Sequence, residues 1–188
     1  MRSQILVLLI ALLVTAQSCC CASILGGPQP PYAITPSDEA VQSFQERMAK
    51  VEPNADGTFS VTITEEEMTS LVVQRLDAQQ DPPPIRQPQV YFRNGRIEVY
   101  GTVDVNDSLS LPGMVAFSVV SGDDGISVTV EEISLGPLPV PDSVLESLNE
   151  EVDQTLTDNV QVGGVEAIIT DVQIGDGEMT ITGKPGGE

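Results

Sequence analysis

The side chains in this sequence that are best suited to chemistry are carboxylates. Glu65, Glu66 and Glu67 follow one another, and so do Glu131 and Glu132. Paired carboxylates perform glycoside hydrolysis, but neighbours on a helix or strand point in different directions, so neither run places two of them over one bond. The chain also has no His, the usual general base and a common zinc ligand. We therefore expect a protein that is not an enzyme.

Two further stretches, residues 104–107 and 122–125, carry Asp and Asn oxygens of the kind that Ca²⁺ prefers. Neither has the spacing of an EF-hand loop with its terminal Glu. Asn and Asp favour tight turns, above all beside Gly. The sequence therefore predicts turns at both places, with no metal site and no cofactor.

The overall charge narrows the range of partners. Of the 188 residues, 28 are acidic and 8 are basic, which gives a net charge of −20. Such a chain repels the phosphates of nucleic acids, so we expect no nucleic-acid partner. The apolar fraction of 40% is typical of a folded, globular chain.

The N-terminus has the pattern of an export signal. After Arg2, an unbroken apolar run of ten residues extends from Ile5 to Val14. The run is shorter than the roughly 20 residues that cross a bilayer. The longer span Ile5–Leu25 reaches that length if its few polar residues are tolerated. An uncleaved signal anchor therefore stays open as an alternative.

All three cysteines of the chain, Cys19, Cys20 and Cys21, directly follow this segment. The small residues Ala16 and Ser18 precede Cys19 at positions −3 and −1, which resembles a bacterial lipoprotein signal. The pattern predicts lipidation of Cys19. The alternative is that the cysteines only end an apolar segment or form disulfides, although no further Cys lies downstream to pair with them.

These features predict three parts of the chain. Residues 1–18 form a lipoprotein-type signal peptide, residues 19–36 form an uncharged tether rich in Gly and Pro, and residues 37–188 form a single α+β domain. We expect the domain to lie at the cell membrane, on its extracytoplasmic face, held by the lipid anchor. Secretion or signal anchoring are the alternative outcomes.

Local patterns predict the elements of the domain. Apolar residues at helical spacing predict a helix over 37–50, and alternating apolar residues predict a strand over 59–63. Thr64 and Glu67 form a capping-box pattern that predicts the start of a second helix. The prolines at 82–84 do not fit a helix and predict an exposed loop after it. The pairs Asn94-Gly95, Asp124-Gly125 and Asp176-Gly177 each separate two alternating segments and predict hairpins.

A longer amphipathic helix is predicted over 141–159, with Glu146, Asn149 and Glu150 on its polar side. The three hairpins predict about six or seven strands in a curved antiparallel sheet. We therefore expect an α+β fold in which this sheet packs on two or three helices, one of them long.

Three segments in this order resemble a known group of proteins: residues 61–68, residues 138–141 leading into Leu145, Leu148 and Asn149, and residues 172–183. They are similar to the YpmS-like bacterial envelope proteins of unknown function and their tubular lipid-binding (TULIP-like) relatives. The resemblance covers residues 58–183. It implies a curved sheet that wraps a long helix and leaves an elongated apolar groove for acyl chains.

The expected function is a membrane-tethered, extracytoplasmic module that binds or handles a lipid or another amphiphile. The alternative is an envelope scaffold or interaction domain with a solid core and an acidic surface, whose protein partner is unknown. The apolar stripes of two helices supply the candidate ligand-binding residues as a group, and for any single one of them core packing is the favoured interpretation. These are Met68, Leu71, Val72, Leu145, Leu148, Val152 and Leu156.

Overall fold

The computed structural model describes residues 26–80, 83–106, 108–122, 125–155, 160–162 and 165–186. Helices and strands alternate irregularly along this part of the chain. They are α2 (Asp38–Ala49), β1 (Phe59–Thr64), α3 (Glu65–Asp77), β2 (Ile85–Arg93), β3 (Arg96–Asn106), β4 (Leu109–Gly122), β5 (Gly125–Leu135), α4 (Asp142–Thr155), β6 (Val160–Val162), β7 (Val165–Ile174) and β8 (Glu178–Pro185).

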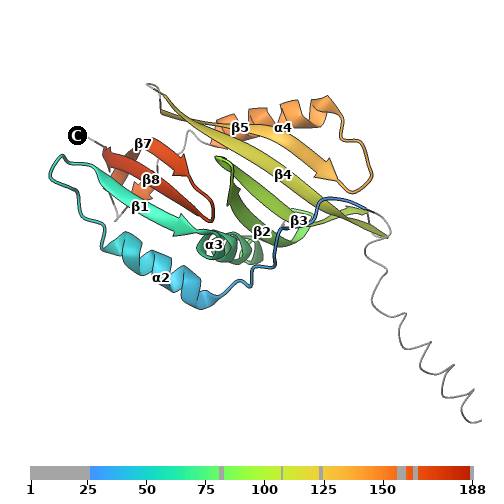
Figure 1. The fold of residues 1–188 in the computed structure, drawn as a ribbon, viewed down its shortest axis with the longest axis horizontal. Coiled ribbons are helices and arrows are strands. Elements are labelled where there is room, and N and C mark those ends of the chain that lie inside the picture. Colours follow the sequence, from blue (N-terminus) through green and yellow to red (C-terminus); the bar gives the residue numbers. More distant parts are fainter. Residues whose placement is uncertain are drawn as a thin grey trace, which may run out of the picture.

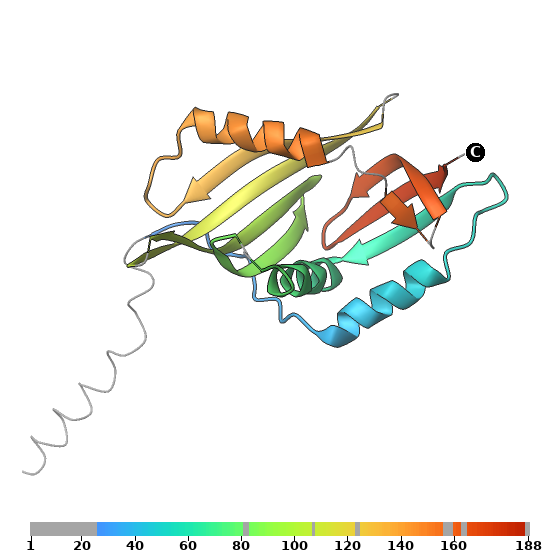
Figure 2. The same ribbon diagram turned by 180° about the vertical axis from the view of Figure 1, so that it is seen from behind.

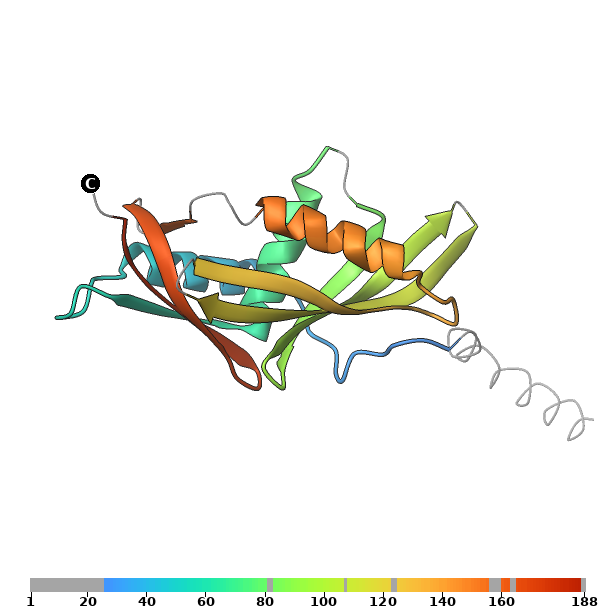
Figure 3. The ribbon, with the colours of Figure 1, turned by 90° about the horizontal axis from the view of Figure 1, so that it is seen from above.

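The strands form two antiparallel sheets. Sheet A has the order β1-β8-β7-β6, and sheet B has the order β2-β3-β4-β5. The sheets lie side by side along the long axis of the molecule, with α3 where they meet (Figure 1, Figure 3). The predicted α+β fold with antiparallel strands and helices is confirmed. The strands, however, divide between two sheets.

The hairpins follow from their turn residues. Asn94 and Gly95 have φ values of 52° and 74°, which a tight turn requires, and they set Phe92 opposite Ile97. The hairpin of β7 and β8 likewise pairs Ile174 with Met179. β4 and β5 pair from Gly113–Leu135 to Gly122–Gly125, and the turn residues 123–124 lie outside the described part. All three predicted hairpins therefore have their strands paired.

Sheet B has one apolar face and one polar face because side chains alternate along each strand. Val99 pairs with Val115, and Val115 in turn pairs with Ile133, so these three side chains share the apolar face. On that face Val90 and Phe92 of β2 pack against α3. α4 lies over the same face and runs along the outer strands (Figure 2, Figure 3).

The N-terminal segment, residues 26–37, crosses the opposite face of sheet B (Figure 3). The ring of Tyr32 meets that of Tyr91 edge to face at 5.2 Å, and the Ile34 amide donates to Gln89 Oε1 at 2.9 Å. The Tyr91 hydroxyl donates to the Tyr32 carbonyl, and burial, followed by the nearby Tyr32 and Glu65, raises the pKa of Tyr91 to about 12. The second half of the predicted tether therefore lies on the domain.

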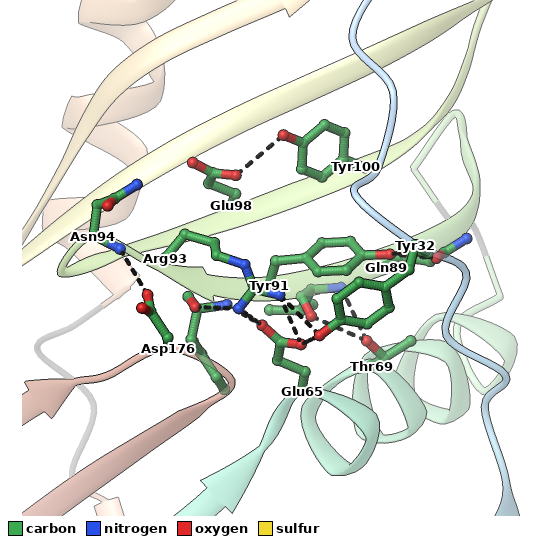
Figure 4. Close-up of polar contacts among 12 residues, drawn as sticks. Tyr32, Glu65, Thr69, Gln89, Tyr91, Arg93, Asn94, Glu98, Tyr100 and Asp176 are labelled. Carbon is green, nitrogen blue, oxygen red and sulfur yellow. Dashed lines mark hydrogen bonds and ion pairs between the residues drawn. The ribbon is translucent and has the colours of Figure 1, made fainter.

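The first residue of α3 joins the two sheets (Figure 4). Glu65 is only 4% exposed, and its carboxylate accepts from the Phe92 amide at 2.8 Å and from the Arg93 guanidinium at 2.5 Å. It also accepts from the hydroxyl of Tyr32. One buried side chain thus connects α3, the end of β2 and the N-terminal segment.

The tip of the β7–β8 hairpin completes this connection. The Gly177 amide donates to the Phe92 carbonyl at 3.1 Å, and the Glu65 amide donates to the Gly177 carbonyl at 3.2 Å. Asp176 accepts from the Asn94 amide at 3.4 Å. The hairpin tip of sheet A is therefore held to the end of β2 by a backbone bond from Gly177 and by the side chain of Asp176.

The start of α3 carries the predicted capping box. The Thr64 hydroxyl accepts from the Glu67 amide, and the Glu67 carboxylate accepts from the Thr64 amide at 3.1 Å. Glu67 also binds Arg47 of α2 through two bonds of 2.6 Å and 2.7 Å. Burial by itself raises the pKa of the Glu67 carboxyl, but the bonds from Arg47 and Thr64 outweigh it, so that this pKa lies below its ordinary value.

A carboxyl with a lowered pKa stabilises the folded state above its unfolded pKa of about 4.3, and the contribution is lost as the pH falls through the folded value. Glu67→Gln keeps an acceptor for the cap but removes the charge facing Arg47. We expect the variant to lose about 1 kcal/mol of unfolding free energy at pH 7, since Arg47 is partly exposed, and the difference to shrink below about pH 4. Urea unfolding between pH 7 and pH 3 measures this.

The matched control for this experiment is Glu66→Gln, one position away on the exposed side of α3. It should leave the pH dependence of stability as it is in the parent protein. A Glu67→Gln variant whose deficit stays constant from pH 7 to pH 3 would contradict the assigned role of the charge.

Candidate functional site: an apolar groove on sheet B

A groove of about 290 Å³ lies on the apolar face of sheet B, at the end covered by the start of α4. None of its fourteen lining residues has an ionisable side chain. The floor comes from β3, β4 and β5, and the wall from the segment that leads into α4. The lining consists of Ile85, Val99, Val103, Gly113, Met114, Val115, Ile133, Ser134, Leu135, Leu138, Pro139, Val140, Pro141 and Val144.

Two glycines shape the floor. Gly101 and Gly113 are opposite each other on β3 and β4. A Cβ on Gly101 would lie 2.8 Å from the Ile85 side chain, and a Cβ on Gly113 would lie 2.9 Å from that of Val103. The missing side chains therefore let neighbouring aliphatic side chains approach and close the floor with apolar atoms.

The wall depends on a turn after β5. Leu135 and Leu138 form an isolated bridge, and Gly136 between them has a φ of 51°, a left-handed conformation that suits glycine. The Gly136 amide donates to the Pro112 carbonyl at 2.8 Å. The chain thus folds back over the end of β4 before α4 begins.

Asn149 fixes α4 to the sheet. Its Oδ1 accepts from the Val130 amide at 2.6 Å, and its Nδ2 donates to the Val130 carbonyl at 3.4 Å. Val130 lies on β5 beside an irregularity in the pairing with β4, and it is 1% exposed. The prediction that Asn149 lies on the polar side of the helix was wrong. Its amide group supplies both an acceptor and a donor to the backbone of Val130. These backbone groups would otherwise lack partners, because β5 is an edge strand of sheet B.

The rim of the groove remains open to solvent. Leu138 is 43% exposed and Val144 is 41% exposed, although both line the groove. Exposed large apolar side chains that border a concave apolar surface indicate a binding site rather than a core.

A larger cavity of about 900 Å³ lies between the N-terminal segment, α3 and the start of β2. Ile85 lines both this cavity and the groove. The lining of the larger cavity is mixed and includes Asp77, Arg86 and Asp104, of which Arg86 and Asp104 form an ion pair at 2.6 Å. Volume alone favours the larger cavity, but lining chemistry makes the groove the better site for an apolar ligand.

The structure divides the predicted ligand-binding residues. Met68, Leu71 and Val72 of α3 are partly buried and pack against the core cluster of Ile63, Val90, Phe92 and Met179. They do not line the groove, but Val99 packs on the same cluster and also lines the groove. The core around α3 is therefore continuous with the groove, and a lipid contact for these three residues stays a prediction.

Of the remaining predicted residues, three lie in α4 and two lie outside the described part of the chain. Leu145 is partly buried, one residue beyond the groove residue Val144. Leu148 and Val152 belong to α4, while Leu156 and the predicted lipidation site Cys19 lie outside the described residues. Sequence reasoning missed the floor and the wall. The signal that pointed to the wall is the run of residues 133–141, which has no charge in a chain of net charge −20.

The carboxylates considered for catalysis have other contacts. Glu65 and Glu67 are engaged by the joint between the sheets and by the cap of α3. Among the described residues, no group of three or more His, Cys, Asp or Glu side chains is placed to hold a metal ion. In the same ranges, no helix has the length and apolar character needed to cross a bilayer.

An α+β fold whose half-open groove is lined without charge defines a protein that binds an apolar ligand. Comparison with family models supports this class: residues 36–184 match the model of the LmeA-like phospholipid-binding family, and the chain belongs to that family. This membership supports lipid binding, and it agrees with the expected tubular lipid-binding relatives. Likeness to the YpmS-like proteins in particular stays a prediction. Searches among curated proteins and among solved structures gave no match.

Asn149→Ala tests how α4 is held over the groove. The substitution leaves the Val130 amide and carbonyl without partners, which costs about 1–3 kcal/mol for a buried polar group. We expect faster hydrogen exchange at the Val130 amide, measured by NMR, while the amides of sheet A keep their exchange rates. Glu150→Ala, at the exposed neighbouring position, is the control. Unchanged protection of Val130 in Asn149→Ala would contradict the assigned bond.

Proposed function

We propose that this protein is a membrane-tethered, extracytoplasmic module that binds phospholipid and holds part of an acyl chain in the groove on sheet B. The observation that carries the proposal is the lining of the groove: fourteen residues without an ionisable side chain, in a family of phospholipid-binding proteins. Acyl chains gain about 0.8 kcal/mol per buried CH₂, so an apolar lining is the feature that binding requires.

The size and openness of the groove fit a partial insertion. Cavities that enclose small molecules have volumes of about 300–1,000 Å³. The groove, at about 290 Å³, lies at the lower end and has an open side. It therefore accommodates a segment of a chain, and the headgroup stays outside. If the protein were only a scaffold, we would expect a solid core beneath α4. The groove at the start of α4 favours the lipid-binding proposal instead.

The tether and the location are inferred from the sequence. The apolar run Ile5–Val14, the small residues before Cys19 and the lack of any charge from residue 3 to residue 37 support export and lipidation. With a net charge of −20, the body of the protein has little attraction to an anionic membrane surface. A covalent anchor would supply the missing attachment.

Filling the groove tests lipid binding. Val115→Phe places a larger side chain among the lining residues, and we expect affinity for a fluorescent phospholipid to fall at least about tenfold, which corresponds to 1.4 kcal/mol. Val119→Phe is the matched control, because Val119 lies on the same strand and face but does not line the groove. Since both variants keep the N-terminal segment, lipid held by that segment cancels in the comparison. Equal affinities would contradict the site.

Single cysteine substitutions test the anchor. Cys19→Ser should abolish incorporation of a labelled fatty acid in bacterial cells, while Cys20→Ser and Cys21→Ser should keep it, because only Cys19 follows the small residues at the expected spacing. The measurement is in-gel detection of the label, together with membrane fractionation. Label that persists in Cys19→Ser would overturn lipidation at this residue and favour the signal anchor.

A further inference from the structure

The rim of the groove and the departure of the N-terminal segment lie at the same end of sheet B. A Cβ on Gly27 would lie 2.7 Å from the Pro112 side chain and 2.9 Å from the Gly136 Cα. Gly136 belongs to the turn that begins the wall of the groove, between the lining residues Leu135 and Leu138. The first described residues of the N-terminal segment therefore lie beside the rim.

The connection to a lipid on Cys19 is short. Gly26 is the seventh residue after Cys19, and a fully extended chain spans at most about 3.6 Å per residue, or about 25 Å in all. The far end of β4 is more distant, because Val120 is the eighth residue after Pro112, which adds about 27 Å of extended strand. A short tether between a lipid on Cys19 and Gly26 would therefore bring the rim end of sheet B, and not its far end, to the bilayer.

The chemistry of this end suits contact with lipid. The exposed side chains of Leu138 and Val144 border the groove, with the prolines at 137, 139 and 141 between them. No residue from 133 to 141 is charged, and the first charged residue after this run is Asp142 at the start of α4. The nearby charges Arg86 and Asp104 neutralise each other in an ion pair.

We propose that Leu138 and Val144 form a membrane-docking rim that inserts into the surface of a zwitterionic bilayer and opens the groove directly toward the lipid. The proposal rests on the function proposed above and adds how a lipid enters. Zwitterionic lipid is the expected partner because the net charge of −20 opposes approach to anionic headgroups. A lipid then passes between bilayer and groove without crossing water.

The chain has no Trp, so one introduced Trp reports on its own position. We would reconstitute the full chain with Leu138→Trp, or with Val144→Trp, in phosphatidylcholine vesicles and measure emission and quenching by brominated acyl chains. We expect a blue shift and strong quenching at both rim positions. Val120→Trp, at a side chain that is 61% exposed on the far part of β4, should show neither.

Two further measurements separate this proposal from lipid binding itself. The rim signal should persist when Val115→Phe is added, because the bilayer, and not a lipid in the groove, is its source. Leu138→Asp combined with Val144→Asp adds charge to two residues that also line the groove, so its effect on transfer is compared with its effect on binding. The variant should lower the rate of transfer of fluorescent phospholipid between vesicles at least about tenfold more than it lowers the affinity for lipid presented in detergent. Equal quenching at Leu138 and Val120, loss of the rim signal in Val115→Phe, or a loss of transfer no larger than the loss of affinity would each overturn the docking rim. Failure of the unsubstituted protein to bind lipid in detergent would instead overturn the proposed function.

Discussion

A carboxylate that is removed from water needs donors in place of the water it loses. Glu65 receives them from two elements of the chain, a backbone amide and a guanidinium at the end of β2 and a hydroxyl on the N-terminal segment. Because Glu65 is the first residue of α3 and its own amide binds the tip of the β7–β8 hairpin, this residue holds the two sheets together at α3. Ser121 of β4 forms a second junction, where its hydroxyl accepts from the Val172 amide of β7 at 3.1 Å. The position of sheet B, and with it the groove, depends on these junctions.

The groove follows from the way the two faces of sheet B are covered. Its polar face carries the N-terminal segment with the stacked rings of Tyr32 and Tyr91. Its apolar face is shared by α3 and α4, which cover different parts of it. Where α3 packs, the core is closed by Val90 and Phe92, both less than 3% exposed. Beyond Val99 the start of α4 covers the strands only in part, and an apolar hollow remains.

Features that depend on neighbouring residues could be predicted from the sequence. Thr64 and Glu67 form the capping box, and the Asn94-Gly95 and Asp176-Gly177 turns join paired strands. Each of these depends on the conformational preferences of a few adjacent residues. The predicted helix over 141–159 corresponds to α4 at Asp142–Thr155, and residues 156–159 lie outside the described part.

Features that depend on distant residues could not be predicted. The separation into two sheets arises because β1 pairs with β8, more than 110 residues away, and no local pattern specifies such a partner. Asn149 looked like a surface residue because its type is polar, yet its target is the backbone of Val130. The residues that line the groove have the types and spacing of ordinary strand and turn residues, so the sequence pattern did not identify them as a site. The uncharged run at 133–141 pointed to the wall of the groove.

The outer strands of sheet B are both occupied by side chains from helices. On β2, the Thr69 hydroxyl accepts from the Val90 amide at 2.9 Å, and on β5 Asn149 takes both backbone groups of Val130. A strand whose hydrogen-bonding groups are free recruits further strands and seeds polymers. This risk is greater for a protein that also exposes apolar side chains at a membrane surface. The side chains of Thr69 and Asn149 occupy backbone groups on both edge strands and so oppose edge-to-edge aggregation, while the groove stays accessible.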